Sequence, residues 1–128
     1  YNLIKAQIGV KFNKEVHLDN FIIRSYSPSD SKNGMNLHRD NINWTGPNGK
    51  VRNVESRIYT TMITLNSNFI GGDFLLEDRK IHPATGRLTI LKSELLHGVD
   101  PLIMGTRYSM LFWMRSDPHV RSFRECHL

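Results

Sequence analysis

Short apolar or alternating segments, separated by turn-forming residues, recur along most of the chain. They are rich in β-branched and aromatic residues, which is typical of strands. Helical periodicity is weak, and Lys5 to Glu15 is the one window that the pattern leaves undecided. The strands that the pattern predicts are Phe21–Tyr26, Met35–Asp40, Tyr59–Leu65, Asp73–Glu77, a short one at Ile81, Leu88–Leu91, Leu95–Val99 and Tyr108–Met114.

Turn residues divide these segments. The cluster from Pro28 to Gly34 ends the first strand, and the polar stretch Asn43 to Ser56 predicts a hairpin tip or a mobile loop. Gly71-Gly72 opens a later hairpin, where a tight turn requires backbone freedom that other residues lack. Many short strands at close spacing predict a mainly β fold, either a sandwich, a barrel or a jelly roll.

Length and composition indicate one ordinary globular domain spanning residues 1–128. Hydrophobic residues make up 39% and charged residues 23% of the 128 positions. No apolar run approaches the roughly eighteen residues of a membrane span. The single cysteine, Cys126, permits no internal disulfide, so we expect a cytoplasmic location. The chain starts at Tyr1 instead of Met, and residues before it are expected in the full protein.

The formal charge of +5 and the pI of about 9.6 would attract anions. A nucleic acid, an acidic substrate and a dicarboxylate co-substrate are all candidates on this ground. The basic residues are scattered along the chain and form no block, which favours a solvated surface with mild electrostatic steering. His82, His119 and His127 have no partner at ligand spacing and are expected at the surface.

The pair His38-x-Asp40 offers an imidazole and a carboxylate to one metal ion. Positions i and i+2 of a strand share a face and lie roughly 6–7 Å apart. The same spacing occurs in His17-x-Asp19, so the motif alone is weak. His17 stands before the strand Phe21–Tyr26, whereas His38 follows that strand and its turn. This context favours the pair of His38 and Asp40 as the metal site.

A third ligand must come from a distant strand, and His97 is the candidate. It lies in an apolar segment, where a core histidine is the alternative. Ten residues later, Arg107, Ser109, Leu111 and Trp113 share one face of a strand whose two faces are both largely apolar. A buried Arg107 needs an anion, which is either a bound carboxylate or an internal Asp or Glu. Two imidazoles and one carboxylate form the ligand set that non-haem iron oxygenases use.

The ordered motifs extend across residues 21–115. They are Tyr26, His38-x-Asp40, Arg57, Thr60–Asn66, Gly71-Gly72, Pro83-x-x-Gly86, His97-Gly98-Val99 and Gly105-x-Arg107. In this order and spacing the chain resembles the iron(II)- and 2-oxoglutarate-dependent dioxygenases, specifically their prolyl-hydroxylase-like branch. The resemblance implies a double-stranded β-helix, a cupin-like jelly roll, with little flanking helix. It also implies iron(II), 2-oxoglutarate and O₂ as reactants, with ascorbate as a reductant.

The resemblance assigns roles to particular residues. It implies that His38, Asp40 and His97 ligate iron, and that Arg107, together with Ser109, binds the distal carboxylate of 2-oxoglutarate. Further candidates for the co-substrate pocket are Tyr26, Met62, Thr64, Phe74 and Trp113. A plain core role is the alternative for Tyr26, Met62, Phe74 and Trp113.

Three features depart from or refine the pattern. Oxygen-sensing prolyl hydroxylases carry a Tyr where this chain has Thr64, and Thr has a shorter reach toward 2-oxoglutarate. Collagen-type prolyl hydroxylases generally use Lys at the Arg107 position, so the chain is closer to the oxygen-sensing type there. The supporting N-terminal helices of the family are largely missing.

The loop Thr45 to Ser56 corresponds to the family's lid over the substrate, with an ordinary surface hairpin as the alternative.

The expected reaction is hydroxylation of a C–H bond with release of succinate and CO₂. The resemblance favours a prolyl residue in a peptide or protein as the substrate. Hydroxylation of a free amino acid or another small molecule is the alternative, and a non-catalytic metal-binding β-helix module is a second one. A nucleic-acid demethylase is disfavoured, because that family has a second Arg six residues after the first, where this chain has Trp113. The oligomeric state is left open.

Overall fold

The computed structural model describes residues 1–30 and 34–118, so the expectations for His119, Cys126 and His127 lie outside the described residues. The elements are α1 (Asn2–Phe12), β1 (His17–Tyr26), β2 (Met35–His38), β3 (Trp44–Thr45), β4 (Val51–Arg52), β5 (Arg57–Thr64), β6 (Ile70–Gly71), β7 (Phe74–Leu76), β8 (Arg79–Ile81), β9 (Leu88–Lys92), β10 (His97–Val99), β11 (Leu102–Met104) and β12 (Arg107–Arg115). No helix in the described part of the chain is long and apolar enough to cross a membrane.

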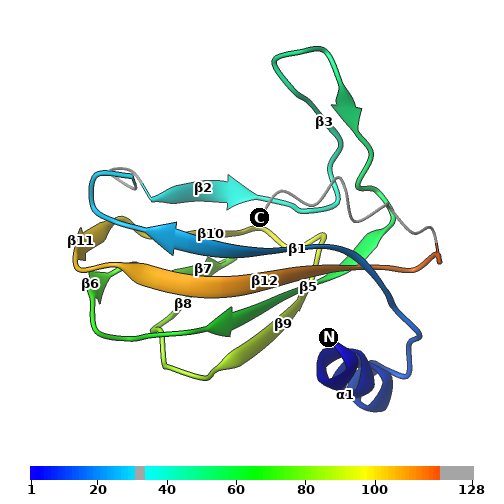
Figure 1. Ribbon diagram of the computed structural model, residues 1–128, viewed down its shortest axis with the longest axis horizontal. Helices are drawn as coiled ribbons and strands as arrows, with labels where there is room; N and C mark the ends of the chain where they lie inside the picture. The colour runs from blue at the N-terminus through cyan, green and yellow to red at the C-terminus, as the bar shows by residue number, and fades with distance from the viewer. Residues whose placement is uncertain (31–33, 119–128) are drawn as a thin grey trace.

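Two four-stranded sheets face each other (Figure 1). The strand order is β1-β12-β5-β9 in the first sheet and β2-β10-β7-β8 in the second, and all pairings are antiparallel. Two smaller strand pairs, β11-β6 and β3-β4, complete the arrangement. The sequence prediction of a mainly β jelly roll with little flanking helix is confirmed.

The strand β12 contributes to two hydrophobic cores. Its inner face packs Leu111 against the core between the sheets, which includes Met62, Phe74 and Val99. Its outer face places Phe112 in a second core on the other side of the first sheet. The strand is therefore buried on both faces, as its two-sided apolar pattern predicts.

The helix α1 covers the outer core. It overlaps Lys5 to Glu15, the window whose secondary structure the sequence pattern leaves undecided. Ile4 and Ile8 are fully or nearly fully buried against β5 and β12. Phe12 stacks on Tyr59 of β5, with the ring centres 5.0 Å apart. The helix ends at Phe12 because Asn13 adopts a left-handed conformation and its N–H donates to the carbonyl of Gly9. Only the first part of the undecided window is helical.

Two predicted strands are shorter than expected. β2 ends at His38, so Asp40 lies in the following turn instead of on the strand face shared with His38. The N–H of Asp40 donates to the carbonyl of Ser93. This hydrogen bond lies outside the regular pairing of β2 with β10. β10 begins only at His97, two residues later than predicted. The predicted strand Phe21–Tyr26 is too short, because β1 already begins at His17, and the other predicted strands agree with the structure to within one or two residues.

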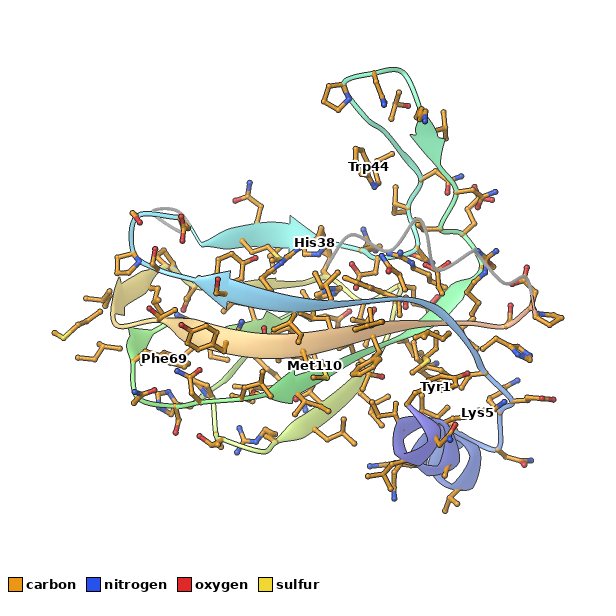
Figure 2. The ribbon with its side chains drawn as sticks, in the orientation of Figure 1. Tyr1, Lys5, His38, Trp44, Phe69 and Met110 are labelled. Atoms are coloured by element: carbon orange, nitrogen blue, oxygen red, sulfur yellow. The ribbon has the colours of Figure 1, made fainter. Side chains whose placement is uncertain are left out.

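The polar stretch Asn43 to Ser56 contains the small hairpin of β3 and β4. In Figure 1 this hairpin projects away from the two sheets. Trp44, at its base, is half-exposed (Figure 2). The prediction of a hairpin in this stretch is confirmed.

A buried ion-pair network ties together the three strands at one end of the first sheet. Asp19 of β1 accepts from Arg57 Nε of β5 at 2.6 Å and from Arg115 Nη1 of β12 at 3.0 Å. The carboxylate has no exposed surface, and both arginine side chains are more than nine-tenths buried. Asp19 therefore serves two cations, of which Arg115 also pairs with Asp117, its Nε lying 2.8 Å from Asp117 Oδ1.

Replacing Asp19 by Ala should strongly destabilise the fold. Removing one partner of a buried ion pair leaves uncompensated charge, at a cost of about 3–5 kcal/mol. The free energy of unfolding from urea titration measures the change. The control is Asp78→Ala, at an exposed carboxylate in the turn between β7 and β8, which should change stability by less than about 0.5 kcal/mol. Equal unfolding midpoints for the two variants would contradict the assigned role of Asp19.

Candidate functional site

The structure brings three sequence-predicted residues into one cluster. One donor atom each from His38, Asp40 and His97 lies within 4.8 Å of the other two. His38 ends β2, Asp40 follows in the turn, and His97 begins β10. The two histidines are direct partners in the pairing of β2 with β10, which places residues 59 positions apart in the sequence side by side. Their ring centres are 4.5 Å apart.

The carboxylate of Asp40 lies between the two imidazoles. Its Oδ1 is 3.3 Å from His38 Nε2, and its Oδ2 is 3.1 Å from His97 Nε2. His97 and Asp40 are largely buried, whereas 38% of the His38 side chain is exposed. The cluster therefore reaches the surface on the His38 side, which Figure 2 shows at the end of β2.

A backbone carbonyl two residues earlier orients each imidazole. His38 Nδ1 is 2.8 Å from the carbonyl oxygen of Asn36, and His97 Nδ1 is 2.9 Å from that of Leu95. A carbonyl oxygen only accepts, so Nδ1 carries the proton in both rings. Each Nε2 then presents its lone pair toward the centre of the cluster when the ring is neutral. This carbonyl–imidazole arrangement is typical of histidines that ligate metals.

Polar side chains on the neighbouring sheet hold Asp40 in its ionised form. Thr60 Oγ1 donates to Asp40 Oδ2 at 2.6 Å, and Ser93 Oγ is 3.1 Å from the same hydroxyl. Burial raises the pKa of Asp40, but the hydrogen bonds from His38 and His97 in their protonated, metal-free form, together with that from Thr60, outweigh it and hold the pKa well below its ordinary value. The hydrogen bond to Asp40 in turn raises the pKa of His38. The carboxylate is therefore an anionic donor at neutral pH.

The cluster fits a divalent transition metal. Two neutral imidazoles and one carboxylate match the ligand set of non-haem iron(II) sites. The carbonyls of Asn36 and Leu95 and the hydroxyl of Thr60 supply the outer contacts that such ligands require.

Arg107 lies in the same pocket, and no carboxylate among the described residues pairs with it. Its side chain is almost fully buried, at 2% exposure. Its contacts are to neutral atoms, with Nη1 3.4 Å from Ser109 Oγ and Nη2 3.2 Å from Met62 Sδ, while Nε has no partner. Within residues 1–30 and 34–118 no carboxylate pairs with Arg107, so an internal salt bridge is not observed. Burial is the main cause that lowers the pKa of Arg107. The guanidinium is poised for a carboxylate ligand.

Comparison with known proteins identifies the family of the chain. The family model described as the 2OG-Fe(II) oxygenase superfamily matches residues 21–115, which is most of the chain. The chain belongs to the 2OG-Fe(II) oxygenase superfamily. A PKHD-type hydroxylase of Delftia acidovorans is 31% identical over 84 residues, which are 62% of this chain and 37% of that protein. The chain thus spans little more than a third of the length of this relative.

Two solved structures share the fold. An oxidoreductase of the 2OG-Fe(II) oxygenase family from Burkholderia pseudomallei matches with a TM-score of 0.69 and 16% identity, covering 89% of this chain and 51% of that one. The viral collagen prolyl hydroxylase of Paramecium Bursaria Chlorella virus-1, in a complex with 2OG, also has a TM-score of 0.69 and 16% identity. That match covers 91% of this chain and 70% of the viral one. These likenesses support the jelly-roll fold.

Most of the pocket residues predicted from the sequence line one continuous pocket. It extends from Arg107 and Ser109 past Met62 to the cluster of His38, Asp40 and His97. Its walls include the predicted residues Tyr26, Phe74 and Trp113.

Thr64 departs from the expectation that it contacts the co-substrate. It is buried and pairs with Ser109 across β5 and β12, but it is not among the residues that line the pocket. Met62, two residues earlier on the same face, contacts the guanidinium of Arg107 instead.

The second H-x-D pair does not form a metal site. The two carboxylate oxygens of Asp19 form ion pairs with Arg57 and Arg115. His17 joins no metal-ligand cluster in the part of the chain that the structure describes. His82 is exposed as predicted, and its Nδ1 lies 2.9 Å from Asp73 Oδ1.

Sequence reasoning missed three residues of the site. Thr60 and Ser93 support Asp40, and Arg24 lines the pocket beside Tyr26. Thr60 could have been found from its position two residues before Met62 on one strand face. Arg24 could have been found in the same way, from its position two residues before Tyr26. Ser93 carries no such signal, because it lies in the loop after β9.

The close pairing of β2 with β10 predicts that Gly98→Ala impairs metal binding. A Cβ at Gly98 would lie 2.5 Å from the carbonyl oxygen of Met35 on β2, which forces apart the strands that carry His38 and His97. Anaerobic calorimetric titration with Fe(II) should show at least about tenfold weaker binding. The control is Gly9→Ala in α1, whose Cβ would meet nothing closer than 3.9 Å. Unchanged metal affinity in Gly98→Ala would contradict this reading of the strand contact.

Proposed function

We propose that this chain is an iron(II)- and 2-oxoglutarate-dependent hydroxylase. In this proposal His38, Asp40 and His97 hold the iron, and Arg107, with Ser109, binds the distal carboxylate of 2-oxoglutarate. The observation that carries it is the buried guanidinium of Arg107, which shares one pocket with the metal-binding cluster and has no carboxylate partner among the described residues.

Charge balance supports this pairing of metal and co-substrate. Iron(II) with the single carboxylate Asp40 leaves one positive charge, and Arg107 contributes a second. The two negative charges of 2-oxoglutarate neutralise both. A bound carboxylate would also compensate the desolvation of Arg107, which is costly while the charge is buried alone.

The chain's own residues position the reactants and exclude water. When bound, iron and 2-oxoglutarate supply the oxidising chemistry, in which O₂ converts 2-oxoglutarate to succinate and CO₂ and hydroxylates a substrate C–H bond. Thr60 fixes the orientation of Asp40, and the carbonyls of Asn36 and Leu95 fix the two imidazoles. Apolar side chains dominate the rest of the pocket wall and limit access of water, namely Met35, Met62, Phe74, Leu91, Val99, Leu111 and Trp113. Ascorbate remains an expected reductant.

A prolyl residue in a peptide or protein is the substrate that we propose. The PKHD-type hydroxylase of Delftia acidovorans and the viral collagen prolyl hydroxylase support it by their names and their similarity. The open side of the cluster at His38 supports access by a large substrate. The alternative is a free amino acid or small molecule. Succinate release with a proline-containing peptide, compared with free proline, separates the two.

Arg107→Met should weaken 2-oxoglutarate binding and spare the metal. Charge-assisted hydrogen bonds contribute about 1.5–3 kcal/mol, so roughly tenfold to a hundredfold weaker binding is expected. Anaerobic titration of the Fe(II) protein with 2-oxoglutarate, followed by the visible metal-to-ligand charge-transfer band, measures it. The control is Arg79→Met on exposed β8. The absence of the band in folded wild-type protein would overturn the proposed function.

His38→Ala should abolish 2-oxoglutarate turnover, whereas His17→Ala should retain it. The first change removes a proposed iron ligand, and the second removes a residue outside the cluster. Succinate release under air with added Fe(II) measures turnover, and circular dichroism checks the fold of both variants. Loss of turnover in His17→Ala alone would show that the wrong H-x-D pair has been assigned.

A further inference from the structure

A second arginine, Arg24, lines the pocket that holds the metal-binding cluster and Arg107. It lies on β1, the edge strand of the first sheet, and its side chain is partly buried. In the pairing of β1 with β12, Tyr26 is opposite Arg107 and Arg24 is opposite Ser109. Arg24 therefore sits one step farther along the strands than Arg107, in the direction of Trp113.

The guanidinium of Arg24 is held in place by an aromatic side chain. Nη1 donates to the hydroxyl of Tyr26 at 3.0 Å, and the guanidinium carbon lies 5.6 Å from the centre of the Tyr26 ring. No carboxylate forms an ion pair with Arg24 within the described ranges. Two arginines thus share one pocket, and their proximity has an electrostatic effect. Burial is the larger cause of the lowered pKa of Arg107, and the charge of Arg24 adds to it.

The charge of Arg24 is surplus to the proposed iron and 2-oxoglutarate site. That site is already neutral when Asp40, Arg107, the metal and the dianionic co-substrate are counted together. A positive charge beside a largely apolar pocket attracts an additional anion, and a guanidinium fork matches a carboxylate. The position of Arg24 on an edge strand leaves it partly accessible, unlike the almost fully buried Arg107.

We propose that Arg24 binds a carboxylate of the substrate and makes this enzyme selective for a molecule with an anionic group near the hydroxylated carbon. This inference rests on the proposed function. Two kinds of substrate carry such a carboxylate. A free amino acid carries it as its α-carboxylate, and a peptide carries it on an acidic side chain. Tyr26 acts as the positioning residue that holds the guanidinium toward the pocket.

Two matched probe pairs test this selectivity. L-proline is compared with L-prolinamide, and the peptide acetyl-Ala-Pro-Glu-amide is compared with acetyl-Ala-Pro-Gln-amide. Each probe is titrated anaerobically into the protein loaded with Fe(II) and 2-oxoglutarate, and binding is followed by the change in the charge-transfer band. In the wild-type protein, at least one acid should bind roughly tenfold or more tightly than its neutral partner, as expected for a charge-assisted hydrogen bond.

Variants assign the preference to Arg24. Arg24→Met should bind the acid and its neutral partner alike, while Arg24→Lys should keep part of the preference. The band formed with 2-oxoglutarate alone is titrated in each variant, so that an effect on the co-substrate is separated from an effect on the acid preference. Arg79→Met, on exposed β8, should behave as the wild type throughout. Circular dichroism and Fe(II) titration verify that each variant folds and holds the metal.

Each outcome has a defined meaning. Preference for L-proline identifies a free amino acid as the source of the carboxylate, and preference for the Glu peptide identifies an acidic peptide. Equal binding of acids and neutral partners to the wild type, binding of none of the four probes, or an unchanged preference in Arg24→Met would overturn the proposal. Loss of 2-oxoglutarate affinity in Arg24→Met would instead make Arg24 a co-substrate residue. Failure of the proposed function is distinguishable from failure of the Arg24 proposal, because the charge-transfer band would then be missing before any probe is added.

Discussion

The strand β12 lies between β1 and β5 and is covered on both faces, by α1 with the outer core and by the second sheet. This double burial places every second residue of the strand inside the pocket, including Arg107 and Ser109. A charge there has no access to bulk water and must find its partner within the protein or in a ligand. Because no carboxylate among the described residues pairs with Arg107, the position of β12 leaves a bound ligand as the partner for this guanidinium.

The buried ion pairs of the first sheet and the charged residues of the pocket have different roles. At one end of the first sheet, Asp19 pairs with Arg57 and Arg115, so these cations are satisfied by the fold itself. Arg57 also stacks over Trp113, with its guanidinium carbon 4.7 Å from the ring centre, and so connects this network to the wall of the pocket. Inside the pocket, the one carboxylate, Asp40, faces two imidazoles. The cations there remain available for ligands.

The sequence predicts the parts of this arrangement that depend on local alternation. The shared face of Arg107 to Trp113 and the strand at Tyr59 follow from patterns a few residues long. The two H-x-D pairs, in contrast, share one motif, and the sequence separates them only by their order relative to the strand Phe21–Tyr26. What distinguishes them is that Asp19 meets Arg57 and Arg115, which are 38 and 96 residues away. Such contacts appear only once the sheet order is known.

Other differences from the sequence predictions have similar physical causes. The helix α1 buries only Ile4 and Ile8, too few positions to give a clear periodic signal. Thr64 shares a strand face with Met62 and pairs with Ser109, yet only Met62 and Ser109 line the pocket, a difference that strand alternation alone does not predict. The Thr60–Asp40 hydrogen bond crosses from one sheet to the turn after β2, and no local pattern encodes it.

The contact between each imidazole and the carbonyl two residues before it has a further consequence. The group that selects the tautomer belongs to the same short segment as the ligand, so the proton on Nδ1 requires no contact with the other sheet. The packing of the two sheets sets only the separation of the donors. The chemical identity of each donor is thereby independent of long-range folding, and only the spacing between donors is a property of the whole domain.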